Sequence, residues 1–238
     1  MTVLGLDTAT PATVAGLLRD DGVAFEARHD PGPDERPGHA TRLLGLVDEV
    51  LAAAGCEMGD VGRIAVGVGP GSFTGLRIGI ATARGLAQAT GAELVSVSTL
   101  RALALNAPER DRTTVAAIDA RRGEVFAAAW TGDTEVMAPT ALAPEDLAAR
   151  LRELAPPAGP PLAGGAPPAL PPLALGDGAV RFRAHLQPAG AAIPPDGDEL
   201  HRIAARHVCR LGAGATPAGI GAVVPHYIRA PDARPRQA

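Results

Sequence analysis

Residues 68–79 read VGPGSFTGLRIG, and this stretch decides the fold that we expect for the chain. The apolar run over 64–68 that leads into it predicts a buried strand, and helical spacing follows it to about residue 90. Gly69 and Gly71 permit backbone angles that other residues avoid, and Pro70 stiffens the loop between them. A strand, a tight loop and a helix in direct succession indicate an α/β protein.

The loop itself has two interpretations. Ser72 or Thr74 can cap the helix start, and the free amides and positive dipole end of a helix favour an anion. Arg77 adds a charge in the first turn, so a phosphate site formed by Gly69, Gly71, Ser72, Thr74 and Arg77 is one interpretation. The other is a purely structural loop. A Walker A loop is excluded, because GxxxxGK[ST] has no match and the chain contains no lysine.

A row of small residues runs along the helix predicted over about 75–90. Glycines inside a helix cost about 1 kcal/mol each relative to alanine, so such a row calls for a reason. One reason is close packing inside the monomer, and the other is a helix–helix contact with a partner chain. Leu76 and Ile80 flank the row and supply apolar contact in either case. The row consists of Gly75, Gly79, Ala83 and Ala87.

Further elements follow from apolar periodicity on both sides of this stretch. An earlier helix is predicted over about 40–54, with its apolar face formed by Leu43, Leu44, Leu46, Val47, Val50, Leu51 and Ala54. Strands are predicted over 3–6, 13–18, 23–28, 94–97, 115–118, 124–130 and 173–175. Shorter helices are predicted from Ser98 or Thr99 to Asn106, and over 179–186 and 198–211.

Two segments of the chain resemble each other. LGLDTATPATVAGL and AAIDARRGEVFAAA each contain an apolar strand, a strand-end aspartate, a polar turn and an apolar return strand. The pair indicates two copies of one α/β unit, although two hairpins can also be similar by chance. Asp7, with Thr8 beside it, and Asp119 are therefore candidate metal or nucleotide ligands. The alternative is turn chemistry, since aspartate readily stabilises turns.

Bulk properties exclude several classes of protein. The chain has 238 residues, 46% of them apolar, and a net charge of −4, with arginine as its basic residue throughout. Cys56 and Cys209 are too far apart for a CxxC pair, so neither a disulfide framework nor a zinc site is expected. With 3% aromatic residues, the chain offers little surface for stacking nucleic-acid bases. The absence of a long apolar run and of a basic leader predicts a cytoplasmic protein without membrane association.

GPGSFTGLRIG resembles the signature of the TsaB (YeaZ) family. LGLDTAT resembles the opening strand and turn of that family, and HATRLLGLVDEVL, which begins at His39, resembles the segment around its first long helix. IDARRGEVFAAAW, LGDGA and PHYIR are similar to its later landmarks. The resemblance runs from residue 3 to about residue 229 and leaves out 155–172.

The resemblance implies an actin-like ATPase fold, as in sugar kinases and Hsp70, with two duplicated α/β lobes. We expect an N-terminal lobe over 1–100 and a C-terminal lobe over 101–215. A Pro/Ala-rich insertion at 155–172 would interrupt the second lobe, and 216–238 would form a C-terminal segment and tail.

The resemblance also implies a function. TsaB proteins dimerise with the paralogue TsaD, which transfers threonylcarbamoyl to adenosine 37 of tRNAs that read ANN codons, and they help recruit TsaE. We accordingly expect an accessory subunit that meets tRNA only through this complex and that can form a homodimer in isolation. In the family the two long helices form the dimer face. The implied interface is Leu43, Leu44, Val47, Leu51, Gly75, Leu76, Gly79, Ile80, Ala83 and Ala87.

The same resemblance implies that the chain is not itself an enzyme. TsaD holds a metal through HxxxH, whereas this chain has His39 followed by Leu43 at the second position. We therefore expect no catalytic residue, metal or cofactor, and we interpret Asp7, Thr8 and the loop as a vestigial nucleotide site. The alternative is an ATP-dependent phosphotransferase, or a peptidase-like hydrolase, of the actin-like superfamily.

Overall fold

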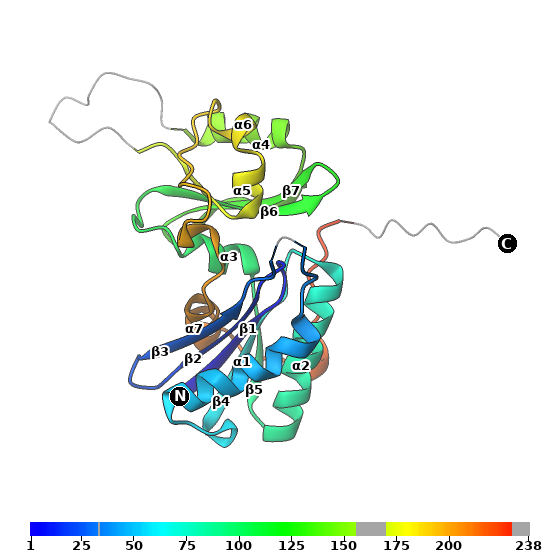
Figure 1. Ribbon diagram of the computed structural model, residues 1–238. Coiled ribbons are helices and arrows are strands. Elements are labelled where there is room, and N and C mark those ends of the chain that lie inside the picture. The colour runs from blue at the N-terminus through cyan, green and yellow to red at the C-terminus, as the bar shows by residue number, and fades with distance from the viewer. Residues whose placement is uncertain (33, 156–169, 230–238) are drawn as a thin grey trace, which may run out of the picture.

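The computed structural model describes residues 1–32, 34–155 and 170–229, which form two stacked α/β lobes (Figure 1). The first lobe is built on a five-stranded sheet of order β3-β2-β1-β4-β5. Its strands are β1 (Thr2–Asp7), β2 (Thr13–Leu18), β3 (Ala24–His29), β4 (Val61–Gly67) and β5 (Glu93–Val97). β1, β2 and β3 pair antiparallel, while β4 and β5 continue the sheet parallel to β1.

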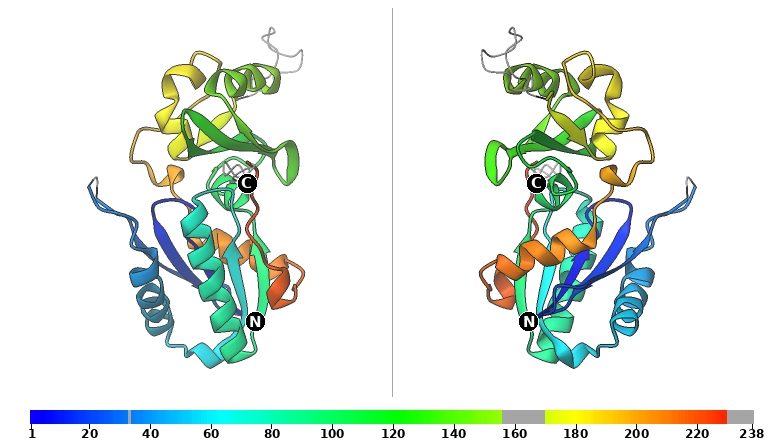
Figure 2. Two further views of the ribbon diagram at one scale, coloured as in Figure 1. Left: turned by 90° about the vertical axis from the view of Figure 1, so that its right-hand side faces the viewer. Right: turned by 90° about the vertical axis from the view of Figure 1, so that its left-hand side faces the viewer.

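Helices cover both faces of this sheet (Figure 2). The long helices α1 (His39–Ala54) and α2 (Phe73–Thr90) lie side by side on one face, and α7 (Ala205–Gly214) packs on the other. Strand alternation explains this, because Leu4 and Leu6 of β1 face α1 and α2 while Val3 faces α7. Short 3-10 turns lie at Met58–Asp60 and Ile220–Ala222.

The second lobe repeats the plan of the first. Its sheet has the order β8-β7-β6-β9, with β6, β7 and β8 antiparallel and β9 parallel to β6. The strands are β6 (Thr113–Arg121), β7 (Glu124–Thr131), β8 (Thr134–Leu142) and β9 (Leu173–Leu175). β6 occupies the place that β1 has in the first sheet, which confirms the predicted duplication and the two-lobed α/β fold.

The second sheet also has helices on both faces. α4 (Pro144–Leu154), α5 (Asp177–Arg181) and α6 (Arg183–Leu186) cover one face. α3 (Thr99–Ala104) covers the other and lies between the sheets, where it shares one hydrophobic core with α7. Within the described ranges, no helix combines the length and apolar character needed to span a bilayer.

Several boundaries differ from those predicted. The helix expected over 198–211 is divided into a 3-10 turn at Glu199–His201 and α7, which begins at Ala205. α7 packs on the first sheet, although the predicted division at residue 100 places it in the second lobe. The insertion expected at 155–172 and the tail lie mostly outside the described residues.

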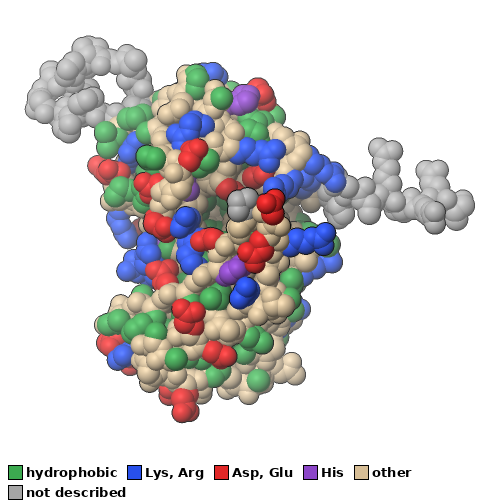
Figure 3. Space-filling model, viewed as in Figure 1, with side chains coloured by type: hydrophobic (Ala, Val, Ile, Leu, Met, Phe, Trp, Pro, Cys, Tyr) green, Lys and Arg blue, Asp and Glu red, His purple; other side chains and the backbone are tan. Residues whose placement is uncertain are grey.

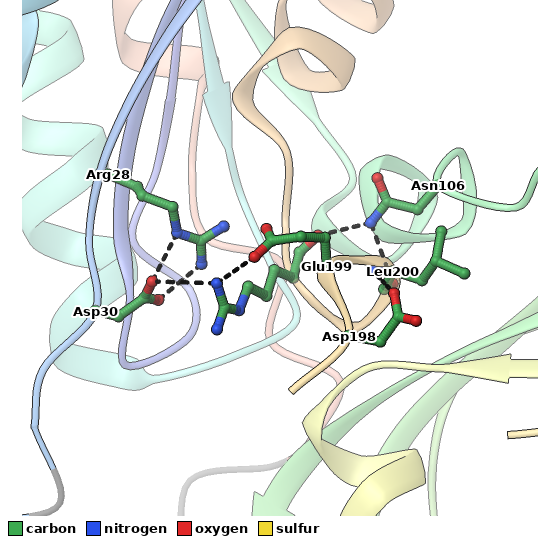
Figure 4. Close-up of polar contacts among 7 residues, drawn as sticks. Arg28, Asp30, Asn106, Asp198, Glu199 and Leu200 are labelled. Carbon is green, nitrogen blue, oxygen red and sulfur yellow. Dashed lines mark hydrogen bonds and ion pairs between the residues drawn. The ribbon is translucent and has the colours of Figure 1, made fainter. Parts of the chain in front are cut away.

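A polar network fixes the point where the chain returns to the first lobe (Figure 4). Arg28, on β3, donates two hydrogen bonds to Asp30, and Arg202 lies between Asp30 and Glu199. The Asn106 side chain donates to the Arg202 carbonyl oxygen at 2.6 Å. Burial alone would raise the pKa of Asp30, but the hydrogen bonds and charges of the arginines outweigh it and lower the pKa.

Candidate functional site

The loop after β4 is held between the segments that follow β1 and β5, the two strands next to β4. The amide of Thr99 donates to Gly69 O at 3.0 Å, and the amide of Ser72 donates to Ala9 O at 2.7 Å. Gly69 has φ +105°, a conformation that glycine adopts readily, and the Gly69–Pro70 peptide is cis. The Ser72 amide is thus already used inside the molecule.

Ser72 caps α2, as predicted, while Thr74 does not. Ser72 Oγ accepts from the Gly75 amide at 3.2 Å, which satisfies one of the free donors of the first turn. Arg77 is exposed, its guanidinium lies 3.6 Å from the Phe73 ring centroid, and its Nε donates to Tyr227 Oη at 3.1 Å. The Arg77 guanidinium therefore contacts the Phe73 ring of its own helix and joins α2 to the C-terminal segment through Tyr227.

The glycines of α2 allow it to lie directly against the turn after β1. A Cβ atom at Gly75 would lie 2.0 Å from Thr8 O, and one at Gly79 would lie 2.3 Å from Thr8 Oγ1. Thr8 Oγ1 in turn donates to Gly75 O at 2.8 Å. Of the two explanations for the small-residue row, close packing inside the monomer is therefore the one that the structure supports.

The side chains predicted for the partner interface are, with one exception, core residues. They pack beneath α1 and α2 against the first sheet, because these helices turn their apolar stripes toward it. The exception is Leu44, which is 53% exposed. The prediction of an interface is wrong for the following buried residues: Leu43, Val47, Leu51, Gly75, Leu76, Gly79, Ile80, Ala83 and Ala87.

The opposite sides of α1 and α2 face outward and carry small and apolar residues among exposed charged ones. We call the outward residues Leu44, Gly45, Ile78, Ala81 and Gly85 the outer face; Ile78 is half-buried and the others are exposed. A Cβ atom added at Gly45 or Gly85 would have no neighbouring atom within 4 Å. The glycines of the outer face are therefore not needed for packing inside the monomer.

Asp7 is enclosed by the fold. Its carboxylate accepts from the Ala9 amide at 2.8 Å and from Thr99 Oγ1 at 2.7 Å. A Cβ atom at Gly67 would lie 1.8 Å from Asp7 Oδ2, so the carboxylate is closed in on that side. Burial raises the pKa of Asp7 to about 6, while the two hydrogen bonds oppose that rise. Of the predicted vestigial nucleotide site, Gly71 and Ser72 line a cavity between the lobes, whereas Asp7 and Thr8 are not among the residues that line it.

We expect Asp7→Asn to remove a pH dependence of folding. Because the folded-state pKa of Asp7 is raised, its stabilising contribution is complete below about pH 4 and is lost as the pH rises through 6. A change of about two pKa units corresponds to about 3 kcal/mol. Relative to the parent chain, the free energy of unfolding of the variant should therefore increase by up to about 3 kcal/mol between pH 4 and pH 8.

Urea unfolding of both proteins across that pH range measures the effect. An unchanged difference in unfolding free energy from pH 4 to pH 8 would show that Asp7 remains solvated. Asparagine keeps the size of the side chain, an acceptor for the Ala9 amide and a donor toward Thr99, so the packing is matched.

A cavity of about 640 Å³ lies between the lobes. Its first-lobe wall comes from the turn after β1 and from the loop that leads into α2. Its second-lobe wall comes from the β6–β7 turn and the start of α5, and the C-terminal segment forms a third side. Among its lining residues are Pro11, Gly71, Ser72, Phe73, Asp119, Arg121, Asp177, Tyr227 and Arg229. Figure 3 shows arginine and acidic side chains interleaved on the face of the molecule where the two lobes meet.

The second-lobe wall is a network of charges. Asp119 lies 2.6 Å from Arg181 and 3.4 Å from Arg121. Its amide donates to Asp177 at 3.0 Å, and burial, with the charge of Asp119 adding to it, raises the pKa of Asp177. Arg121 has φ +63°, a left-handed conformation that is uncommon for a residue with a side chain. Unlike Asp7, Asp119 does face the cavity.

His39 is buried and lines the interlobe cavity. Its Nδ1 lies 2.8 Å from Thr13 Oγ1, and Leu43, at the second position of the HxxxH pattern, is fully packed in the core. Burial, with the charge of His29 adding to it, lowers the pKa of His39. Within the part of the chain that the structure describes, no group of three or more His, Cys, Asp or Glu residues is placed to hold a metal ion.

The duplicated sheets, the helices on both faces and the cavity between the lobes define an actin-like ATPase fold. A solved structure from Pseudomonas aeruginosa, described as an uncharacterized protein with similarity to peptidase YeaZ, superposes with a TM-score of 0.73 at 28% identity. That match covers 96% of this chain and 99% of the other chain. The prediction of this fold is confirmed.

Sequence comparison carries the assignment further. The model for TsaD, tRNA N6-adenosine threonylcarbamoyltransferase, matches residues 35–170. The chain is 41% identical over 135 residues to the TsaB protein of Escherichia coli, named for tRNA threonylcarbamoyladenosine biosynthesis, covering 56% of each protein. A Bacillus subtilis relative of the same name is 34% identical, with 53% of each covered. The matched segments thus span about half the length of these relatives. The chain belongs to the TsaD family, and within it to the TsaB (YeaZ) proteins.

Proposed function

We propose that this chain is a non-catalytic accessory subunit in the synthesis of N6-threonylcarbamoyladenosine (t6A) at adenosine 37 of tRNAs that read ANN codons. The family membership and the names of the TsaB relatives support a role in this pathway. In the proposed complex the chain pairs with a catalytic TsaD-type paralogue of related fold. A TsaE-type ATPase joins that assembly, and tRNA is contacted only through it, in the cytoplasm.

The contacts made by the residues of the predicted vestigial nucleotide site support an accessory role. The Asp7 carboxylate and the Thr8 hydroxyl are bonded inside the fold, and the Ser72 amide and hydroxyl are used by neighbouring backbone groups. Each of these groups contributes to folding in the place where an actin-like ATPase would contact its nucleotide.

The observation that carries the proposal is the outer face. Leu44 supplies an exposed apolar side chain, and Gly45, Ala81 and Gly85 allow another backbone to approach closely. We propose that a TsaD-type partner docks there, and that a second copy of this chain takes the same place when the partner is absent. The interface predicted from the sequence is thus retained on α1 and α2 but moved to their opposite sides.

A reconstituted reaction tests the role of the chain. It contains a TsaD-type protein, a TsaE-type ATPase, a TsaC-type enzyme and tRNA, with and without this chain, and t6A is measured by mass spectrometry. We expect t6A to form only when the chain is present, and the chain alone to leave tRNA unmodified. Equal t6A formation without the chain would contradict the accessory role.

A further inference from the structure

The C-terminal segment connects the two lobes a third time. We call residues 223–229 the strap. Val223 is fully buried, and the Arg84 guanidinium of α2 donates to its carbonyl oxygen at 2.6 Å. Further along, the amide of His226 donates to Val68 O at 2.8 Å. The beginning of the strap is therefore bound to α2 and to the end of β4 in the first lobe.

The middle of the strap lies beside the start of α2. The Tyr227 ring stacks on Phe73 with centroids 5.4 Å apart and rings inclined by 25°, and Arg77 contacts both residues. Stacked aromatic rings of this kind add a modest stabilisation beyond that from the area that they bury. Tyr227 and Phe73 both line the interlobe cavity, so this contact forms part of its mouth.

The end of the strap contacts the second lobe mainly through Arg229, while Ile228 packs against the hydrophobic core that the lobes share. Arg229 forms an ion pair with Glu124 at the start of β7 and donates to Ala120 O at 3.2 Å. Its guanidinium also lies 5.7 Å from the Phe126 ring centroid. Glu124 and Ala120 flank the β6–β7 turn, so Arg229 holds the wall of the cavity that faces the α2 loop.

The two attachments differ in strength. The first-lobe end is anchored by the buried Val223 side chain, by the backbone hydrogen bond from His226 to Val68 and by the hydrogen bond from the Arg84 side chain to Val223 O. The second-lobe end has the Arg229–Glu124 ion pair, whose side chains are 27% and 43% exposed, beside one hydrogen bond to Ala120 O and the contact with Phe126. Exposed ion pairs are weak and sensitive to salt. The bond to Glu124 is therefore the part of the strap that we expect to break first.

We propose that residues 223–229 are a strap that holds the lobes closed over the interlobe cavity, with Arg229–Glu124 as its releasable end. This inference does not depend on the proposed function. Breaking the ion pair detaches the strap, which stays on the α2 side of the cavity, from the β6–β7 turn. The two lobes can then rotate relative to each other about α3 and the segment that leads into α7.

Spin labels on the two lobes test the proposal in the full chain. Labels are placed at Arg210→Cys on α7 and Ala149→Cys on α4, both exposed, in a Cys56→Ser background. Cys209 stays unlabelled, because its thiol is buried and its pKa is raised to about 12. Labelled protein is diluted with unlabelled chain so that distances within one molecule are recorded.

With the strap closed, we expect one narrow distance distribution. Arg229→Ala and the milder Glu124→Gln should each broaden it at least twofold or add a second distance. The charge swap Arg229→Glu with Glu124→Arg should narrow it again. High salt should broaden the parent distribution but have little further effect on Glu124→Gln.

Arg19→Ala is the matched control, since it removes a pair with Asp21 that lies inside the first lobe, with side chains 38% and 43% exposed, and should change nothing. If Arg229→Ala lowers the folding yield, Glu124→Gln decides the question alone. A distribution that is unchanged in Glu124→Gln, or that changes equally in Arg19→Ala, would overturn the strap.

Discussion

Gly75→Ala should destabilise the protein by about 2–3 kcal/mol, although alanine is the better helix former. The added Cβ would lie 2.0 Å from Thr8 O, a backbone atom of the turn after β1. A backbone atom cannot swing aside as a side chain can, so α2 or the turn must shift. The hydrogen bond from Thr8 Oγ1 to Gly75 O would be lost with that shift. The clash outweighs the ~1 kcal/mol gained in helix propensity.

Gly85→Ala, on the same helix, is the matched control. A Cβ there meets no atom within 4 Å, so the helix propensity acts alone and should stabilise the protein by about 0.5–1 kcal/mol. Thermal unfolding measures both, with a decrease of about 4–12 °C in Tm expected for Gly75→Ala. Equal effects of the two substitutions would show that α2 is not pressed against the β1 turn.

Gly85→Arg should leave the monomer folded and reduce affinity for a TsaD-type partner at least ~30-fold, or about 2 kcal/mol. The arginine would extend from the outer face into the space that the partner is proposed to occupy, where a bulky charge has neither room nor a counter-charge. Ala81→Arg, one turn earlier and also exposed, should act in the same direction.

Ala149→Arg serves as the control for these variants, because it places the same charge on an exposed helix of the second lobe. Calorimetric titration with the purified partner gives the affinities, and the Tm of each variant confirms that the fold is intact. Binding of Gly85→Arg and Ala81→Arg at the strength of the parent chain would remove the outer face from the interface.

Much of the fold follows from local sequence patterns. The strands of the first sheet alternate or run apolar between clear turns, and α1 and α2 carry apolar residues at helical spacing. The likeness of the segments around Asp7 and Asp119 indicates the duplication from the sequence alone. Two elements, β8 and α4, were missed. α4 carries a recognisable signal, with Pro144 at its first position and Glu145 and Asp146 in its first turn.

The orientation of α2 could not be obtained from the sequence. Both sides of this helix carry small residues: Gly79 faces Thr8, and Gly85 faces outward. The spacing identifies a row suited to close packing but does not say what packs there. Leu76 and Ile80, which flank the row, were the available signal, since large apolar side chains beside it indicate the buried side.

The cavity and the strap depend on long-range contacts that no local pattern reports. Arg229 meets Glu124 and Ala120 more than a hundred positions earlier in the chain, and Tyr227 stacks on Phe73. From the sequence, PHYIR is recognisable only as a landmark of the family. In the same way, a strand-end aspartate suits either a ligand or a turn, and burial decided that Asp7 is enclosed while Asp119 faces the cavity.

The central claim is that the chain supports t6A synthesis by docking a partner through the outer face of α1 and α2. The direct measurement is the t6A content of tRNA in cells depleted of the chain and complemented with the parent sequence, Gly85→Arg or Ala149→Arg at equal protein levels. We predict that depletion removes t6A, that the parent and Ala149→Arg restore it, and that Gly85→Arg does not. Normal t6A after complete depletion, or full restoration by Gly85→Arg, would contradict the claim.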